Sequence, residues 1–320
     1  MNELVEGIIS GNTRAISKAI SLVENDGPDK IELLKEIHRY VGESVIIGIT
    51  GPPGAGKSSL INVLIKEYRK QGKKVGILAI DPTSPFTGGA LLGDRLRMQD
   101  HSTDENVFIR SLATRGHLGG ISPATSDAVK ILDAAGFEII LLETVGVGQA
   151  EIEIVEASDI VLLVLVPGYG DEIQVLKAGI IEIGDIYVIN KADQMDATKL
   201  KTTIEYYLEL SPDKNANHRK VVLTSALTGS GVDSLIHEIN STYNFFRKKG
   251  ILNERRKTRI RKEILRILNS RILESINQTF NGRNFDSSIN KILNKKIDPY
   301  TIADSIFEEM KKGAKHDRKD

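Results

Sequence analysis

A glycine-rich loop between an apolar run and a helix-forming stretch constrains this chain more than any other feature. Residues 46–60 read IIGITGPPGAGKSSL and match the pattern G-x-x-x-x-G-K-[ST]. In this pattern the glycines let the backbone curl so that several N–H groups point inward, and the following helix adds the positive end of its dipole. Lys57 supplies a mobile cation and Ser58 a hydroxyl for Mg²⁺. The loop therefore predicts a binding site for the phosphates of a nucleotide.

The surroundings of the loop are those that the pattern requires. Residues 45–50 are expected to form a buried strand and residues 58–71 a helix, so the loop joins a strand to the start of a helix. The alternative is an ordinary strand-turn-helix connection without a ligand. On the phosphate-binding interpretation the loop residues that contact the nucleotide are Gly51, Pro52, Pro53, Gly54, Ala55, Gly56, Lys57, Ser58 and Ser59.

The composition limits the classes of partner. Among 320 residues, Lys plus Arg and Asp plus Glu both total 43, so the charge gives no argument for nucleic acid or an anionic membrane as a partner. The chain has no cysteine, which excludes disulfides and thiolate metal sites and fits a reducing compartment. No run approaches the roughly 20 apolar residues of a membrane span, and charged residues interrupt the apolar positions of residues 1–22. We therefore expect a soluble, cytoplasmic protein.

Changes of pattern divide the chain into three predicted regions, 1–43, 44–249 and 250–320. The first carries apolar positions at helical spacing around a turn at 25–28, which predicts two helices. The second contains short apolar runs at 45–50, 74–80, 107–111, 137–142, 160–166, 186–189 and 221–223. Strands that are apolar throughout are covered on both faces, so we predict an α/β domain with a mainly parallel central sheet. Its ligand should lie beyond the carboxyl ends of the strands.

Acidic residues follow two of these predicted strands. The run at 74–80 leads into DPTSPFTGG, whose prolines and glycines delay the next helix, so a loop carries Asp81 and later Asp94. Acidic groups near phosphates are costly unless a cation intervenes, so we expect Asp81 and Asp94 to share a Mg²⁺ ion; the alternative is that they cap turns. After the run at 137–142, Glu143 occupies the place of a Walker B carboxylate, which orients the Mg²⁺ or its water.

Glycines after Glu143 predict a second contact to the phosphates. Gly146 can present a backbone N–H group to a γ-phosphate, and the flanking glycines let the loop move when that phosphate leaves. Gln149 is a candidate for orienting an attacking water, or else a solvated side chain at the start of a helix. Residues 167–172 read PGYGDE and form either a mobile element at the nucleotide edge or a simple connection.

The strongest signal of base specificity follows the strand at 186–189. The tetrapeptide N-K-x-D is made of Asn190, Lys191 and Asp193. Its carboxylate pairs with the N1–H and 2-amino groups of guanine, while the lysine lies along the base. Adenine leaves that acceptor unpaired, which costs roughly tenfold to a hundredfold in preference. The tripeptide Ser225-Ala226-Leu227 follows the last strand, as does the loop that backs guanine in GTPases, so we expect GTP and GDP as ligands.

The third region, 250–320, has a different pattern. Apolar residues step by four from Ile260 to Ile276, which predicts a long amphipathic helix, and two shorter helices are expected around 289–292 and 300–310. Residues 311–320 are expected to be disordered. From residue 251 onward, 17 Lys and Arg stand against 10 Asp and Glu, a surplus of 7. The regular apolar stripe, without interleaved aromatic residues, favours a helical dimerisation arm over nucleic-acid binding.

Taken together, these loops resemble one family, the MeaB-type G proteins, also called the ArgK or LAO/AO transport ATPase family, which includes the human methylmalonic aciduria type A protein. The segments that carry the resemblance are GPPGAGKSSL, AIDPTSPFTGGALLGDRLRM, SLATRGHLGG, LLETVGVGQAE and VPGYGDEIQVLKAGI. The resemblance extends in motif order from about Gly7 to Phe246, and more loosely into the C-terminal helices. The strings after the second and fourth predicted strands are far more specific than a phosphate-loop motif.

The resemblance implies a homodimeric P-loop GTPase of the SIMIBI class, which includes signal-recognition and metallochaperone G proteins. It implies a chaperone of adenosylcobalamin-dependent acyl-CoA mutases, chiefly methylmalonyl-CoA mutase, that gates cofactor loading and protects or reactivates the mutase with GTP hydrolysis as a timer. By this pattern Lys57 and Ser58 hold the phosphates and Mg²⁺, and Asp81, Asp94 and Glu143 surround the metal and the attacking water. The loop 168–177 resembles the family's additional switch, with Tyr169 where many members have Ala or Ser.

Other functions remain open at this point. The family's older name implies an ATPase or kinase that serves uptake of lysine, arginine and ornithine, and N-K-x-D argues against it. A nickel metallochaperone usually carries His-rich or Cys-containing sites, whereas this chain has no cysteine and scattered histidines. A scaffold that binds GTP without hydrolysing it is a third alternative. The candidates for an arginine finger are Arg95, Arg110 and Arg115, although the sequence favours the alternative that each is a salt-bridged loop residue.

Overall fold

The computed structural model describes residues 1–81, 101, 103–113, 123–144, 150–168, 180–210, 218–279 and 283–316. Its contacts divide the chain into two compact units, Met1–Arg255 and Arg256–Asp320. The first unit holds the sheet and every described part of the predicted nucleotide site. The division into regions 1–43, 44–249 and 250–320 stays a prediction.

Seven strands of the described chain form one sheet in the order β3-β2-β4-β1-β5-β6-β7, and all of their pairings are parallel. The strands are β1 (Val45–Thr50), β2 (Val75–Asp81), β3 (Val107–Ala113), β4 (Ile139–Thr144), β5 (Ile160–Leu165), β6 (Ile186–Ile189) and β7 (Lys220–Leu223). Each predicted run corresponds to one strand, with ends that differ by at most two residues. The predicted α/β class with a parallel sheet is therefore confirmed.

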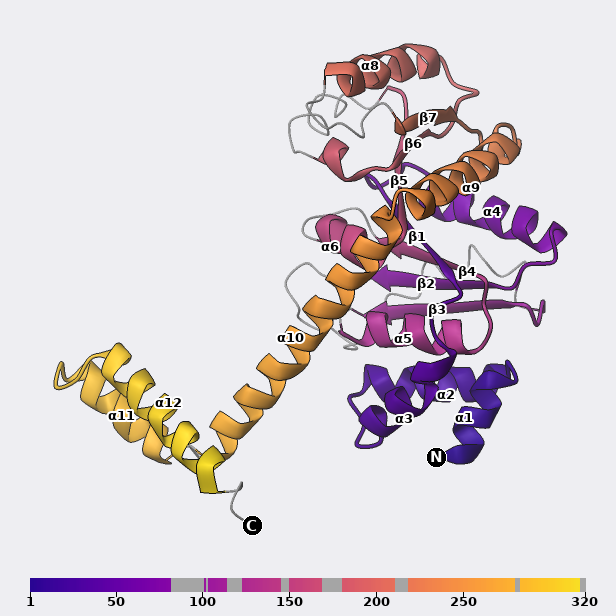
Figure 1. The fold of residues 1–320 in the computed structure, drawn as a ribbon. Coiled ribbons are helices and arrows are strands. Elements are labelled where there is room, and N and C mark those ends of the chain that lie inside the picture. Colours follow the sequence, from indigo (N-terminus) through magenta and orange to yellow (C-terminus); the bar gives the residue numbers. More distant parts are fainter. Residues whose placement is uncertain are drawn as a thin grey trace. The chain divides into compact units, whose positions relative to one another are not determined.

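Helices cover both faces of this sheet (Figure 1). On one face α4 (Lys57–Lys70) and α9 (Val232–Lys248) pack against alternate strand residues such as Ile47 and Ile49. On the other face α5 (Pro123–Ala134) and α6 (Ala150–Ala157) pack against the intervening residues. The helix α8 (Ala197–Leu210) covers that same face over β5, β6 and β7, and a 3-10 turn spans Ile180–Ile183. Burial on both faces explains why the central strands, such as β5 and β6, are apolar.

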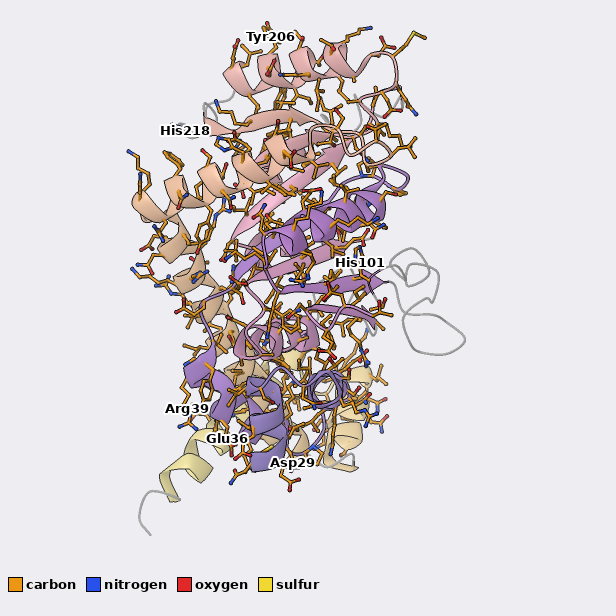
Figure 2. All side chains as sticks on the ribbon, turned by 90° about the vertical axis from the view of Figure 1, so that its right-hand side faces the viewer. Asp29, Glu36, Arg39, His101, Tyr206 and His218 are labelled. Carbon is orange, nitrogen blue, oxygen red and sulfur yellow. The ribbon has the colours of Figure 1, made fainter. Side chains whose placement is uncertain are left out.

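Three α-helices precede the first strand, where two were predicted. They are α1 (Asn2–Ile9), α2 (Thr13–Glu24) and α3 (Lys30–Ile37), followed by a 3-10 turn at His38–Tyr40. The missed break lies at Gly11, whose φ of +76° suits glycine, and at Asn12, whose side chain accepts hydrogen bonds from the N–H groups of Arg14 and Ala15. These helices bury apolar side chains against α5, while Asp29 and Arg39 are exposed (Figure 2).

A buried carboxylate fixes the junction between these helices and β1. Asp133, near the end of α5, accepts hydrogen bonds from the backbone N–H groups of Gly42 (2.7 Å), Glu43 (3.2 Å) and Ser44 (3.1 Å) and from the Ser44 hydroxyl (2.8 Å). Asp133 is only 7% exposed. A carboxylate that accepts several N–H groups at once is strongly held, so Asp133 sets where the N-terminal region meets the sheet.

The helix that follows α9 is anchored at the amino ends of two strands. Arg255 donates to both carboxylate oxygens of Asp185 (2.7 and 2.8 Å) and to the carbonyl of Asp159 (3.0 Å). Its guanidinium also lies 4.7 Å from the centre of the Phe246 ring. A bidentate pair with an additional cation–π contact fixes this arginine strongly. One of the basic residues counted from residue 251 onward thus forms its ion pair inside the first unit.

The second unit consists of helices. The long helix α10 (Ile251–Thr279) starts in the first unit and continues into the second, which also contains α11 (Arg283–Leu293) and α12 (Pro299–His316). The three predicted helices are confirmed, but the predicted disorder was wrong for residues 311–316, which belong to α12, and residues 317–320 lie outside the described residues. In the part of the chain that the structure describes, no helix is both long enough and apolar enough to cross a bilayer.

The apolar row of α10 does not lie along one straight face. Ile260, Ile264, Leu268 and Ile272 are between 47% and 57% exposed within the chain. An α-helix has 3.6 residues per turn, so each step of four advances the row by about 40°, and four steps turn it by roughly 160°. The predicted stripe is therefore present, but it winds around the helix.

Candidate functional site: the loops at the carboxyl edge of the sheet

In the loop that connects β1 to α4, Gly51 and Gly56 combine a positive φ with a close approach to a neighbouring segment. Gly51 has φ +141°, and a Cβ atom there would lie 2.1 Å from the carbonyl oxygen of Val164 in β5. Gly56 has φ +83°, and a Cβ atom there would lie 2.5 Å from Nδ2 of Asn190. Both glycines thus allow close approach to neighbouring strands and loops. The loop ends at the start of α4, where free N–H groups favour an anion.

The ammonium group of Lys57 is held over this loop. Its Nζ donates to the carbonyl oxygens of Gly51 (2.8 Å) and Pro52 (3.1 Å), and the residue is only 7% exposed. A preorganised cation at the mouth of a phosphate-binding loop stabilises the negative charge of a transferring phosphoryl group. The structure therefore places the Lys57 ammonium beside the loop that the sequence pattern defines, and its role in binding phosphates stays a prediction.

Ser58 and Glu143 lie next to each other. The Ser58 hydroxyl donates to Oε1 of Glu143 at 2.7 Å, and the two residues are 7% and 5% exposed. The pairing follows from the sheet, because β4 neighbours β1 with Glu143 in register with Ile49. A hydroxyl and a carboxylate are oxygen ligands of the kind that Mg²⁺ binds, so these two side chains fit such an ion.

The remaining predicted metal ligands are only partly described. The backbone of Asp81 ends β2, two residues beyond Ala79, which is in register with Glu143 of the neighbouring strand. The side chain of Asp81 and the whole of Asp94 lie outside the described residues, as do Gly146, Gln149 and residues 169–179. Among the described side chains no group of three or more Asp, Glu or His gathers as a metal site.

Asn190 ties the phosphate loop to the loop after β7. Its Nδ2 donates to the carbonyl of Ala55 (2.9 Å) and, more weakly, to that of Gly56 (3.4 Å), and its Oδ1 accepts from the N–H of Ala226 (3.0 Å). Asn190 is 1% exposed. The sequence identified this residue as part of a base-binding motif. The structure adds that its side chain joins two loops that are far apart in sequence.

The loops predicted to bind the base lie side by side. The N–H of Ala192 donates to the carbonyl of Thr224 (2.9 Å), which joins the N-K-x-D loop to the loop of Ser225-Ala226-Leu227. The Ser225 hydroxyl donates to the Asp193 carboxylate and lowers the pKa of Asp193 below its ordinary value, with a smaller contribution from the charge of Lys191. Asp193 is therefore ionised at neutral pH, the form in which a carboxylate only accepts hydrogen bonds.

Two buried hydroxyls at this edge escaped the sequence analysis. Thr50 ends β1 and Thr144 ends β4, and their side chains are hydrogen-bonded to each other at 3.0 Å. The signal in the sequence was a polar residue at the end of an otherwise apolar strand. Of the candidate arginine fingers, Arg110 pairs with Glu24 (2.8 Å) and Ser21 (3.0 Å) of α2, so it belongs to the N-terminal packing. Arg95 and Arg115 lie outside the described residues.

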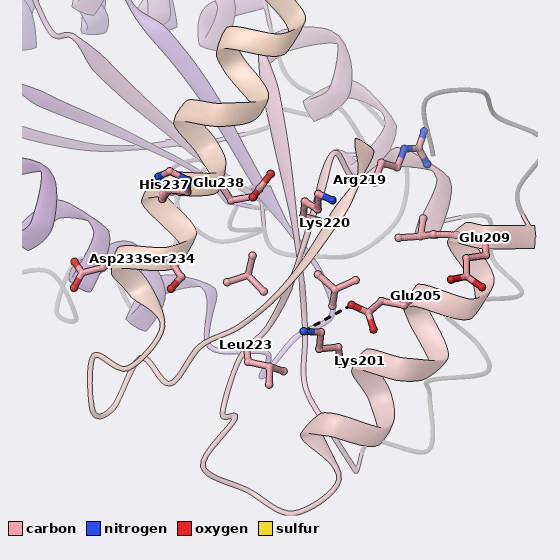
Figure 3. A pocket seen from close by; sticks show the side chains of 13 residues that line it. Lys201, Glu205, Glu209, Arg219, Lys220, Leu223, Asp233, Ser234, His237 and Glu238 are labelled. Atoms are coloured by element: carbon pink, nitrogen blue, oxygen red, sulfur yellow. Dashed lines mark ion pairs between the residues drawn. The ribbon is translucent and has the colours of Figure 1, made fainter. Parts of the chain in front are cut away.

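A cavity of about 960 Å³ lies away from these loops, between α8 and α9 over the edge strand β7 (Figure 3). Its lining includes basic residues such as Lys201 and Arg219 and acidic residues such as Glu205 and Glu238. None of the predicted site residues lines it. The cavity therefore adds nothing to the nucleotide site.

The sheet and the loop between β1 and α4 define the chain as a P-loop nucleoside triphosphatase of the α/β class. A profile of the family described as "Methylmalonyl Co-A mutase-associated GTPase MeaB" matches residues 16–281. The chain belongs to this family of GTPases, which are hydrolases of GTP. The predicted membership is confirmed.

Individual relatives agree with the family assignment. A Pyrococcus horikoshii protein named "Putative GTPase PH0274" is 48% identical over 313 residues, covering 97% of this chain and 98% of that protein. The mouse protein named "Methylmalonic aciduria type A homolog, mitochondrial" is 32% identical over 97% of this chain and 80% of its own length. GTPase ArgK of Escherichia coli is 36% identical over 74% of this chain and 74% of its own length. The crystal structure of an LAO/AO transport system kinase superposes with a TM-score of 0.71 over 97% of both chains at 24% identity, which shows the shared fold.

Replacing Asp193 by asparagine is expected to reduce the preference for GTP over ATP at least tenfold. The substitution replaces a carboxylate, which accepts hydrogen bonds from the N–H groups of guanine, with an amide. The amide no longer discriminates against adenine. Competition between GTP and ATP for the purified protein measures the ratio. Asp196→Asn, an exposed change three residues further on, is the matched control. An unchanged ratio in Asp193→Asn would show that the base pocket is wrongly assigned.

Proposed function

We propose that this GTPase is a chaperone of an adenosylcobalamin-dependent acyl-CoA mutase, with methylmalonyl-CoA mutase as the preferred client. In the cytoplasm it gates cofactor loading and protects or reactivates the mutase, and GTP hydrolysis times each cycle. The observation that carries the proposal is the match of residues 16–281 to a family described as mutase-associated. The name of the mouse relative, a methylmalonic aciduria type A homolog, supports the same client.

The site residues divide by role in this proposal. Phosphates are bound by the loop from Gly51 to Ser59, with Gly146 at the γ-phosphate, and the base by Asn190, Lys191, Asp193, Ser225, Ala226 and Leu227. Mg²⁺ is held by Ser58, Asp81, Asp94 and Glu143. Lys57, Asp94, Glu143 and Gln149 act in hydrolysis. The Ser58–Glu143 hydrogen bond and the position of the Lys57 ammonium support these assignments.

The chemistry is in-line attack of water on the γ-phosphorus, which breaks the bond to the β–γ bridging oxygen and releases GDP and phosphate. Lys57 and the loop N–H groups stabilise the negative charge that spreads over the phosphoryl oxygens. Ser58 and Glu143 would hold Mg²⁺ here, and the ion would supply further positive charge to the phosphates. Ser58 and Glu143 are already paired and buried, so they would need little rearrangement to bind the ion.

Copurification tests the chaperone role. The full-length chain is mixed with candidate mutases, among them methylmalonyl-CoA mutase, in GDP, in a non-hydrolysable GTP analogue and without nucleotide. We expect association with the client that changes with the nucleotide, and ATP analogues serve as the control. Absence of nucleotide-dependent association with every adenosylcobalamin-dependent mutase tried would contradict the chaperone role and leave GTP hydrolysis standing.

We propose further that the chain is a homodimer joined through its C-terminal helices. The half-exposed isoleucines and leucines that wind around α10 are apolar surface of the kind that subunits bury. Rows spaced by four residues pack into similar rows at crossing angles near −50°, so the partner helix is expected to cross α10 obliquely. Ile264→Glu should shift the mass in light scattering towards the monomer, while Thr258→Glu on the same helix should not. A monomeric wild-type chain at all concentrations would contradict this.

The transport ATPase or kinase is not carried further as a second function. One protein of similar structure is called an LAO/AO transport system kinase, but at 24% identity the likeness concerns the fold alone. The nickel metallochaperone has no observation in its favour among the described side chains, where no metal-binding group of three gathers.

A further inference from the structure

A pair of buried hydroxyls joins the last residues of β1 and β4. The Thr144 hydroxyl donates to the Thr50 hydroxyl at 3.0 Å, and both residues are 0% exposed. The two strands are neighbours in the sheet and are otherwise apolar up to Glu143. Valine has the shape of threonine and needs no hydrogen bond when buried. Two adjacent threonines in such a place therefore indicate that the bond between them matters.

The pair lies where both halves of the phosphate site leave the sheet. Thr50 is bonded directly to Gly51, whose carbonyl oxygen accepts from the Lys57 ammonium (2.8 Å). Thr144 follows Glu143, whose carboxylate accepts from the Ser58 hydroxyl (2.7 Å). Any change in the separation of the two strand ends moves one of these contacts relative to the other.

The pair acts from the opposite face of the sheet. Successive side chains of a strand point to opposite faces, so Thr144 lies on the far side from Glu143. Ile49 packs in the cluster of α4 and α9, so Thr50, the next residue, faces away from α4. The hydroxyl pair thus lies on one face of the sheet, and the Ser58–Glu143 contact lies on the other face.

We propose that the Thr50–Thr144 hydrogen bond is a positioning element of the hydrolytic site, which fixes the phosphate loop relative to the strand end that carries Glu143. It thereby sets the geometry of the Ser58–Glu143 pair that receives Mg²⁺. Neither threonine touches the nucleotide. The inference rests on the proposed Mg²⁺-dependent hydrolysis of GTP at this site.

The test compares Thr144→Val, which removes the hydroxyl and keeps the shape, with Thr144→Ser, which keeps the hydroxyl. In the full-length chain, Thr144→Val is expected to raise the Mg²⁺ concentration for half-maximal GTP hydrolysis about threefold to tenfold and to lower kcat by a similar factor. Affinity for GDP in EDTA should stay within about twofold, because the loop itself is unchanged. In the Thr144→Ser variant, which keeps a hydroxyl, the Mg²⁺ concentration for half-maximal hydrolysis should stay within about twofold of the wild-type value.

A matched control separates positioning from stability. Thr242→Val makes the same change in α9, where the residue is 6% exposed and its hydroxyl lies 3.5 Å from Glu238. This variant should alter the thermal midpoint without altering the Mg²⁺ dependence. Thr50→Val provides the same readout from the other strand if Thr144→Val does not fold, and the double variant should be no worse than either single one.

The outcomes distinguish this inference from the function on which it rests. Wild-type protein that does not hydrolyse GTP with Mg²⁺ would overturn the proposed function. Active wild-type protein together with unchanged Mg²⁺ dependence and kcat in a folded Thr144→Val or Thr50→Val variant would overturn the positioning role alone. A Thr242→Val variant that shifts the Mg²⁺ dependence as far as Thr144→Val would show that the effect is one of general stability.

Discussion

Replacing Lys57 by alanine is expected to lower the rate of GTP hydrolysis at least a hundredfold and to weaken nucleotide binding. The buried ammonium donates to the carbonyls of Gly51 and Pro52, at the loop where the proposed function puts the phosphates. Loss of one preorganised donor to developing negative charge costs roughly a hundredfold to a thousandfold in rate. Phosphate release measured under saturating GTP gives kcat, and nucleotide titration gives the affinity.

Lys70→Ala is the matched control for this change. Lys70 lies on the same helix, its side chain is 70% exposed, and its ion pair with Glu67 is on the surface. Such pairs contribute little, so this variant should hydrolyse GTP within about twofold of wild type. A Lys57→Ala variant that retains most of its activity would contradict the assignment of the loop between β1 and α4 as the phosphate site.

Asp133→Ala is expected to lower the free energy of unfolding of the first unit by about 3 kcal/mol. The substitution leaves the N–H groups of residues 42–44 without the acceptor that they share, whereas the Ser44 hydroxyl can still donate to the carbonyl of Phe137. Each buried donor left unsatisfied costs about 1–3 kcal/mol, and the most exposed of them can turn to water. A loss of this size corresponds to a fall of roughly 6–12 °C in the thermal midpoint of a unit this large.

The thermal midpoint from circular dichroism checks this prediction. Asp29→Ala removes an exposed aspartate that makes no side-chain capping bond to α3, so its midpoint should stay within about 2 °C of wild type. Equal midpoints for wild type and Asp133→Ala would show that the junction at residues 42–44 is held by other contacts.

The strands and the site loops were predictable because their signals are local. The central strands, such as β5 and β6, are apolar because helices bury both of their faces, and the motifs after β1, β4 and β6 are contiguous strings. Parallel strands bring their carboxyl ends to one edge, so the order of motifs implied that they meet. Ser58 and Glu143 confirm that meeting at 2.7 Å.

Some hydrogen bonds between residues far apart in the chain could not be predicted from the sequence. Asn190 holds the carbonyl of Ala55 across 135 positions, and Thr144 reaches Thr50 across 94. No periodicity or motif encodes such pairs, because each depends on how the strands are ordered in the sheet. The third N-terminal helix was missed for a different reason. The apolar residues on both sides of Gly11 and Asn12 keep helical spacing, so the spacing alone does not reveal that one helix ends there and the next begins at an asparagine cap.

Competition between GTP and ATP for the full-length chain tests the central claim most directly. One nucleotide is labelled and displaced by the other in the presence of Mg²⁺, and hydrolysis of each is then measured alone. We predict at least tenfold tighter binding of GTP than of ATP, and Mg²⁺-dependent release of phosphate from GTP. Equal or tighter binding of ATP would contradict the guanine site formed by Asn190, Asp193 and Ser225.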